Sequence, residues 1–150
     1  VLHYIRNVVS TTADTTLTVA QSGSVCTGNK ADGITITLPA AATGLTYAVH
    51  VGTTITSNAF TITAASSADT MQGQLISNDF TDLGSITLLN ESVATVGFDQ
   101  PAADDHQIVM DGTTKGGKLG SYVNCTAITA AIWHVDGFLS SDGSLATCFT

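Results

Sequence analysis

Hydrophobic and polar residues alternate over short stretches of this chain, with a period of two residues rather than 3.6. Between residues 34 and 38, Ile34, Ile36 and Leu38 alternate with Thr35 and Thr37. Successive side chains of an extended strand point to opposite faces, so this pattern predicts a strand with one apolar face and one threonine face. The abundance of β-branched residues also favours strands.

Eight segments of this kind are expected to form strands. They cover residues 34–38, 47–51, 59–63, 85–89, 93–98, 107–110, 121–125 and 131–135. Turn-forming sequences rich in Gly, Asp, Ser and Pro separate them at short intervals. The helix candidate at residues 39–44 is too short for more than one turn. The pattern therefore predicts an all-β single domain, an antiparallel β-sandwich or a barrel-like arrangement of short strands.

The N-terminal residues 1–19 differ in character from residues 20–150. Residues 1–9 are apolar and β-prone, and a polar spacer follows them. This segment is expected to be either an outer strand of the same sheet or an arm that exchanges with a neighbouring subunit. Residues 20–150 are expected to form the all-β domain.

The 150 residues include few charged ones, and this composition argues against some classes of partner. Only 11% of the residues are charged, 43% are hydrophobic, and the formal net charge is −8. Nucleic acids and anionic membrane surfaces are bound by clustered Lys and Arg, whereas this chain has four dispersed ones, so neither is expected as a partner. No apolar run reaches the length of a membrane-spanning helix, and no secretory signal pattern is recognised.

Three cysteines, Cys26, Cys125 and Cys148, are widely spaced and form no Cys-x-x-Cys pair, so a structural zinc site is not expected. We interpret them as small reduced core residues, consistent with cytoplasmic production. A bridge from Cys148 to Cys26 or to Cys125 is the alternative.

The residues that could carry chemistry do not form a recognised catalytic pattern. No Gly-x-Ser-x-Gly elbow accompanies the histidines His3, His50, His106 and His134, which are interpreted as structural or interface residues. Asp99, Asp104, Asp105 and His106 are expected in one solvated acidic loop, and the glycine-rich residues 111–120 in a mobile hairpin loop. Neither segment matches a calcium or phosphate loop. No catalytic residue, metal site or cofactor is therefore expected.

Trp133 is the single tryptophan and lies in the last predicted strand. A lone large aromatic residue in a strand is usually a core anchor, and otherwise an interface anchor.

Three segments of the sequence carry a resemblance to a known class of proteins. Residues 17–53 read LTVAQSGSVCTGNKADGITITLPAAATGLTYAVHVGT, FTITAASSADTMQG follows at 60–73, and AIWHVDG lies at 131–137. This series resembles small bacteriophage structural domains of capsid decoration (cement) proteins and of some tail-fibre or tailspike segments. Residues 74–129 and the N-terminal segment carry no recognised motif.

The resemblance implies a structural virion protein without enzyme activity. It implies binding to the major capsid protein on the outside of an assembled icosahedral capsid, stabilisation of the shell, and a homotrimer. Interface residues are expected in the N-terminal segment and at the tryptophan: Val1, Leu2, His3, Tyr4, Ile5, Arg6 and Trp133. The first alternative is a tail-fibre or tailspike module that binds a host-surface glycan. A virion glycosidase acting through Asp104 or Asp105 is a third.

Overall fold

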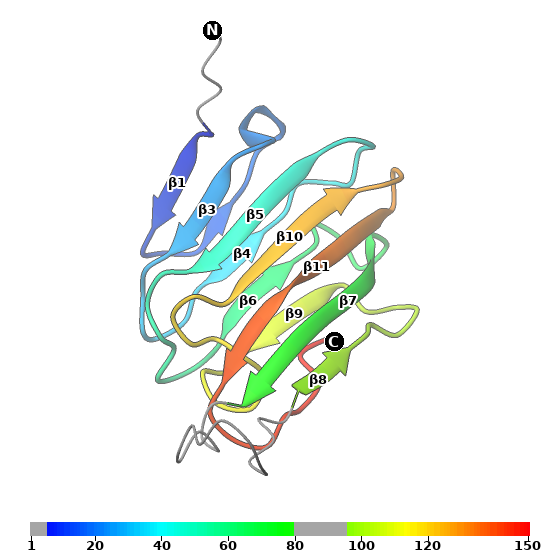
Figure 1. The fold of residues 1–150 in the computed structure, drawn as a ribbon. Helices are drawn as coiled ribbons and strands as arrows, with labels where there is room; N and C mark the ends of the chain where they lie inside the picture. The colour runs from blue at the N-terminus through cyan, green and yellow to red at the C-terminus, as the bar shows by residue number, and fades with distance from the viewer. Residues whose placement is uncertain (1–5, 80–95) are drawn as a thin grey trace, which may run out of the picture.

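The computed structural model describes residues 6–79 and 96–150, in which eleven strands form two stacked sheets (Figure 1). The large sheet has the order β1 (Val8–Thr11), β3 (Val25–Gly28), β5 (Thr46–Val51), β10 (Tyr122–Ala127), β11 (Ile132–Ser141), β7 (Thr70–Asp79) and β8 (Val96–Asp99). The small sheet has the order β2 (Thr15–Thr16), β4 (Thr35–Thr37), β6 (Phe60–Thr63) and β9 (Gln107–Met110). A 3₁₀ turn, η1, covers Val19–Gln21. The expected all-β fold is confirmed, and no helix long and apolar enough to cross a membrane is found in the described ranges.

The first six strands alternate between the two sheets and form successive coils. β1, β3 and β5 are parallel neighbours in the large sheet, and β2, β4 and β6 are parallel neighbours in the small sheet. Val25 pairs with both Val8 and Ala48, so the first coil spans 17 residues and the second 23. Because the coils differ in length, this structural repeat leaves no regular repeat in the sequence.

The expectation of antiparallel pairing is therefore wrong for much of the sandwich. Of the nine strand pairs in the described residues, five are parallel and four are antiparallel. Short connections normally favour antiparallel hairpins. Between β1 and β6 the connections carry the chain across to the opposite sheet, and β3 to β6 each pair with the strand one coil earlier. The fifth parallel pair joins β7 and β11.

The β10–β11 hairpin completes the large sheet in its middle. β10 is antiparallel to β5, and β11 is parallel to β7 over ten residue pairs. β8 then pairs with the other side of β7. The hairpin thus joins the coiled N-terminal half to β7 and β8 (Figure 1).

Side chains from both sheets fill one core between them. Tyr47 and Trp133 project from the large sheet, and Ile36, Phe60 and Ile62 from the small sheet; all are fully buried. The Tyr47 and Trp133 rings pack with their centroids 5.9 Å apart. The inward positions alternate with more exposed ones along β3, β4, β6, β9 and β10, as strand geometry requires.

The N-terminal residues that the structure describes belong to the sandwich. β1 and β2 are the outer strands of the large and small sheets, which is the arrangement that the outer-strand alternative describes for residues 8–16. Residues 1–5, the expected strand at 85–89 and part of that at 93–98 lie outside the described residues.

Candidate functional site

The outward face of the large sheet carries a row of apolar and aromatic side chains at one level of five neighbouring strands. Tyr122 pairs with His50 on one side and with Phe138 on the other. Phe138 pairs with Ile76, and Ile76 pairs with Phe98. We call these five residues, His50, Tyr122, Phe138, Ile76 and Phe98, the aromatic row. Neighbouring strands lie about 4.8 Å apart, so the row is roughly 20 Å long.

The members of the aromatic row are accessible to different degrees. Phe98 is 65% exposed and Ile76 is 39% exposed, whereas His50, Tyr122 and Phe138 are half-buried. The His50 and Tyr122 rings stack with centroids 5.6 Å apart and planes 22° apart. Burial lowers the pKa of His50 below its usual 6.5, and the positive charge of Arg6 lowers it further. Phe98 and Ile76 are therefore the most accessible members of the row.

A row of amide and carboxylate side chains runs beside the aromatic row on the same face. Asn124 pairs with Asp136, and Asp136 pairs with Gln74. The Asn124 Nδ2 atom donates a hydrogen bond of 2.8 Å to Asp136 Oδ1. We call Asn124, Asp136 and Gln74 the polar row. The hydrogen bond fixes the orientation of the carboxylate.

A hollow of about 560 Å³ lies between the two rows. Tyr122 and Ile76 line it from the aromatic row, and Gln74 and Asp136 from the polar row. His134, Gln100 and the backbone of Gly73, Val135 and Gly137 complete the lining. A second hollow of about 410 Å³ shares Gly73 and Gln100 with the first and extends along Gln72 to residues 101–103. The two adjoining hollows form a groove to which Tyr122 contributes a phenol ring and several side chains contribute hydrogen-bonding groups.

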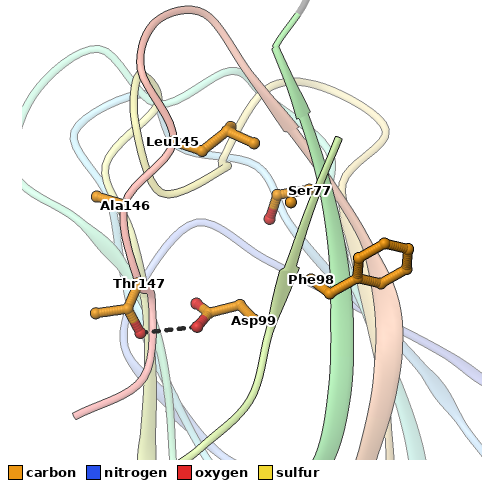
Figure 2. Close-up of a pocket in the computed structure, with 7 residues that line it drawn as sticks. Ser77, Phe98, Asp99, Leu145, Ala146 and Thr147 are labelled. Carbon is orange, nitrogen blue, oxygen red and sulfur yellow. Dashed lines mark hydrogen bonds between the residues drawn. The ribbon is translucent and has the colours of Figure 1, made fainter. Parts of the chain in front are cut away.

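A smaller pocket of about 190 Å³ lies between β7, β8 and the C-terminal segment (Figure 2). Ser77 and Asp99 face Leu145, Ala146 and Thr147, whereas the Phe98 ring points away to the outward face. Asp99 accepts hydrogen bonds from Thr147 Oγ1 at 2.9 Å and from the Cys148 amide at 2.5 Å. Both oxygens of this carboxylate are thus engaged in holding the C-terminal segment, and the pocket is smaller than a typical ligand site.

The acidic cluster expected around Asp99 is divided between different structural roles. Asp99 ends β8 and anchors the C-terminal segment, so its placement in a solvated loop is wrong. Asp105 accepts a hydrogen bond from the Ala102 amide, and His106 Nδ1 lies 3.3 Å from the Asp104 carbonyl oxygen. Within residues 6–79 and 96–150, no three His, Cys, Asp or Glu side chains are placed to hold a metal ion.

The glycine-rich residues 111–120 connect β9 in the small sheet to β10 in the large sheet, so they do not form the expected hairpin loop. Asp111 organises this connection by accepting hydrogen bonds from the Thr113 and Lys115 amides and from the Thr114 hydroxyl. Burial would raise the pKa of Asp111, but these hydrogen bonds outweigh it and lower the pKa below 3.8.

The cysteines are free and buried, as expected, and none forms a bridge. Burial raises the pKa of Cys26 to about 11 and that of Cys125 to about 12, where the Asp136 charge adds to the effect. Burial and the neighbouring Asp99 also raise the pKa of Cys148. The thiols are therefore protonated at neutral pH and behave as small core groups.

The structure places the two described residues of the expected interface, Trp133 and Arg6, in different environments. Trp133 is 0% exposed, which makes it a core anchor and overturns its assignment to an interface. Arg6 is exposed, and its Nε donates a hydrogen bond of 3.1 Å to the Gly23 carbonyl oxygen. Val1, Leu2, His3, Tyr4 and Ile5 lie outside the described residues.

Sequence reasoning missed the aromatic row because its members are far apart in the chain. Period-two alternation does place Tyr122 on the polar side of its strand, and Phe98 ends an expected strand. Their alignment depends on which strands become neighbours, and the insertion of β10–β11 between β5 and β7 determines this.

Comparisons with protein-family models, curated proteins and solved structures find no match for this chain.

Proposed function

We propose that this protein is a structural virion component that binds the outside of an assembled phage capsid and stabilises the shell by bridging subunits of the major capsid protein. The resemblance of residues 17–73 and 133–137 to capsid decoration proteins motivates this function. The residues of that resemblance form the coils from η1 to β6 and the beginning of β7, together with the middle of β11.

The unpaired edges of β1 and β2, the strands of the first coil, are the observation that best supports the proposal. β1 pairs with β3 alone and β2 with β4 alone, so within the described residues both sheets end in an edge strand at the N-terminal side. The edge strand β1 exposes Val8, which is 62% accessible. Unpaired backbone groups at a sheet edge can accept a strand from another chain. A capsid subunit or a neighbouring copy in a homotrimer could be joined in this way.

The proposal is tested by adding the purified protein to undecorated capsids and measuring bound copies and the temperature at which the shells open. We expect a rise in opening temperature with the unmodified protein. Val8→Lys places a charge on the edge and should weaken binding, because an edge lysine opposes strand addition. Val19→Lys is the matched control, since Val19 is 60% exposed on η1. Unchanged shell stability with the bound unmodified protein would contradict the cement role.

A tail-fibre or tailspike module is the second candidate. The exposed Phe98 ring and the half-buried Tyr122 and Phe138 rings favour it, because aromatic platforms are suited to ligand recognition. A reconstruction of the virion separates the two candidates, since the chain would be found on the shell in one case and at the tail in the other.

A further inference from the structure

The geometry points to a carbohydrate-binding site on the outward face of the large sheet, in the hollow between the aromatic row and the polar row. We propose that this site takes uncharged oligosaccharides. The inference does not depend on whether the chain lies on the shell or at the tail, because it rests on the chemistry of this face alone.

The Tyr122 ring supplies the apolar half of the site. It is half-buried, it lines the hollow, and its stacking on His50 holds its orientation. The face of an aromatic ring carries partial negative charge and attracts polarised C–H groups. A pyranose ring presents such C–H groups on one face, so it can lie against Tyr122.

Side chains around the hollow supply the hydrogen bonds that sugar hydroxyls require. Asp136 Oδ1 is occupied by Asn124, while its Oδ2 has no hydrogen-bond partner among the described residues. The exposed side chains of Gln74, Gln100 and His134 also line the hollow. A carboxylate oxygen accepts from a hydroxyl, and amides both donate and accept. A hydroxyl-rich ligand satisfies these groups simultaneously.

The charge of the site selects against other occupants. Asp136 is the charged side chain that lines the hollow, and no lysine or arginine is in its lining. Nucleic acids, anionic lipids and acidic sugars would therefore be repelled. A protein partner covering the face would bury the Asp136 carboxylate, which is costly without a cationic partner. An uncharged sugar supplies hydroxyl donors and leaves the carboxylate partly hydrated.

The size of the groove fits an oligosaccharide. The hollow of about 560 Å³ lies within the range of small-molecule sites, roughly 300–1,000 Å³. The adjoining hollow of about 410 Å³ continues past Gln100 to Pro101. We therefore expect more than one sugar unit to be bound.

The test starts with the full chain on an array of uncharged and sialylated oligosaccharides, followed by calorimetric titration with the uncharged oligosaccharide that binds best. Tyr122→Ala and Asp136→Asn should each weaken binding about tenfold, as expected for loss of a ring contact or of hydrogen bonds to a charge. Tyr122→Phe keeps the ring and should therefore retain most of the affinity of the unmodified protein. Leu119→Ala is the control, because Leu119 is 65% exposed and does not line the hollow.

Thermal unfolding of each variant shows whether weaker binding comes from loss of the fold, and the Tyr122→Phe and Asp136→Asn variants preserve side-chain volume. Failure of every uncharged oligosaccharide to bind would overturn the proposal, as would binding that Tyr122→Ala and Asp136→Asn leave unchanged. Capsid binding is measured separately with the same variants. Loss of capsid binding without any sugar binding would assign this face to the capsid and refute the carbohydrate site, whereas sugar binding without capsid binding would refute the decoration role alone.

Discussion

The surroundings of His50, at the end of the aromatic row, favour the neutral form of its imidazole. Its ring stacks on Tyr122, and both burial and the Arg6 charge lower its pKa below 6.5. In the unfolded chain the imidazole is expected to titrate near the ordinary value of 6.5. The unfolded state therefore binds more protons than the folded state in the interval just below that pH.

We predict that the free energy of unfolding falls as the pH decreases from about 6.5 toward the lowered pKa of His50, and that His50 causes no such loss above pH 6.5. His50→Gln removes the titrating group and should give a flatter stability profile in this interval. Urea unfolding, followed by tryptophan fluorescence from pH 5 to pH 8, measures the free energy of unfolding of both proteins. Equal slopes for the two proteins would show that His50 does not contribute.

Gly73 combines a positive φ with a close approach to a neighbouring strand. Its φ is +130°, and an added Cβ would overlap the Val135 carbonyl oxygen on β11. Gly44 also has a positive φ of +94°, but an added Cβ there would meet no atom within 4 Å. Substitutions at the two glycines can therefore separate the cost of backbone strain from the cost of steric overlap.

Gly44→Ala should destabilise the protein by about 1–2 kcal/mol, the usual cost of a left-handed conformation for a residue with a side chain. Gly73→Ala should cost clearly more, because β7 and β11 must also move apart. Thermal unfolding of both variants checks this order, with about 2–4 °C expected for each kcal/mol in a chain of this size. Equal melting temperatures would mean that β7 adjusts without displacing β11.

At the scale of elements, β8 is linked to the C-terminal segment through Asp99. This carboxylate accepts hydrogen bonds from Thr147 and the Cys148 amide, and Cys148 packs in the core. The segment also contacts β9, where Ile108 forms a bridge with Phe149. Asp99 therefore connects the edge of the large sheet to a segment lying beside the small sheet.

Asp99→Ala should destabilise the protein by about 1–3 kcal/mol, since the Cys148 amide loses a charged acceptor. Hydrogen exchange of the Cys148 amide should accelerate more than exchange of amides in β10. Asp104→Ala is the control, because Asp104 is an exposed loop residue for which only a backbone contact is found in the described part of the chain. Unaltered exchange at Cys148 in Asp99→Ala would show that the segment is held by its apolar contacts.

The sequence pattern predicts individual strands better than their neighbours. The expected segment 107–110 coincides with β9, and the segments at 47–51, 59–63 and 121–125 differ from β5, β6 and β10 by one or two residues at an end. β7 was missed because its inward positions include Gly73, Ser77 and Asp79, which interrupt the apolar alternation. β3 was missed because it has only four residues and ends in a glycine.

The candidate site could not be predicted for a different reason. Alternation fixes which face of its own strand each residue occupies, but the relative position of two strands depends on pairing and register. His50, Tyr122 and Phe138 come together through two antiparallel pairings, and Ile76 joins through a parallel one. Local sequence carries little information about such pairings between distant segments.

At the scale of the whole molecule, a net charge of −8 opposes close association of several copies. The proposed homotrimer must overcome this repulsion through contacts at neutral surfaces such as the β1 edge. Salt reduces repulsion between exposed charges, with a Debye length of about 3 Å at 1 M.

We therefore predict that self-association strengthens as salt is raised from about 0.01 M to 1 M, between which the Debye length falls from about 30 Å to 3 Å. Sedimentation velocity over a concentration series measures the monomer and trimer fractions. Val8→Lys adds a positive charge and so lowers repulsion, yet it should weaken trimers if β1 is their contact. A trimer that dissociates in high salt would instead indicate an assembly held by ion pairs.

The position of the β10–β11 hairpin has a consequence for how the chain is made. Its strands follow all other described strands along the chain, yet they occupy the middle of the large sheet, between β5 and β7. Until Ala127 has been synthesised, β5 lacks its complete neighbour β10; until Ser141 has been synthesised, β7 lacks its complete neighbour β11, and the core between the sheets is not fully packed. The large sheet therefore cannot close before the hairpin has been made, and polypeptides halted before it present the unpaired edges of β5 and β7 to chaperones and proteases.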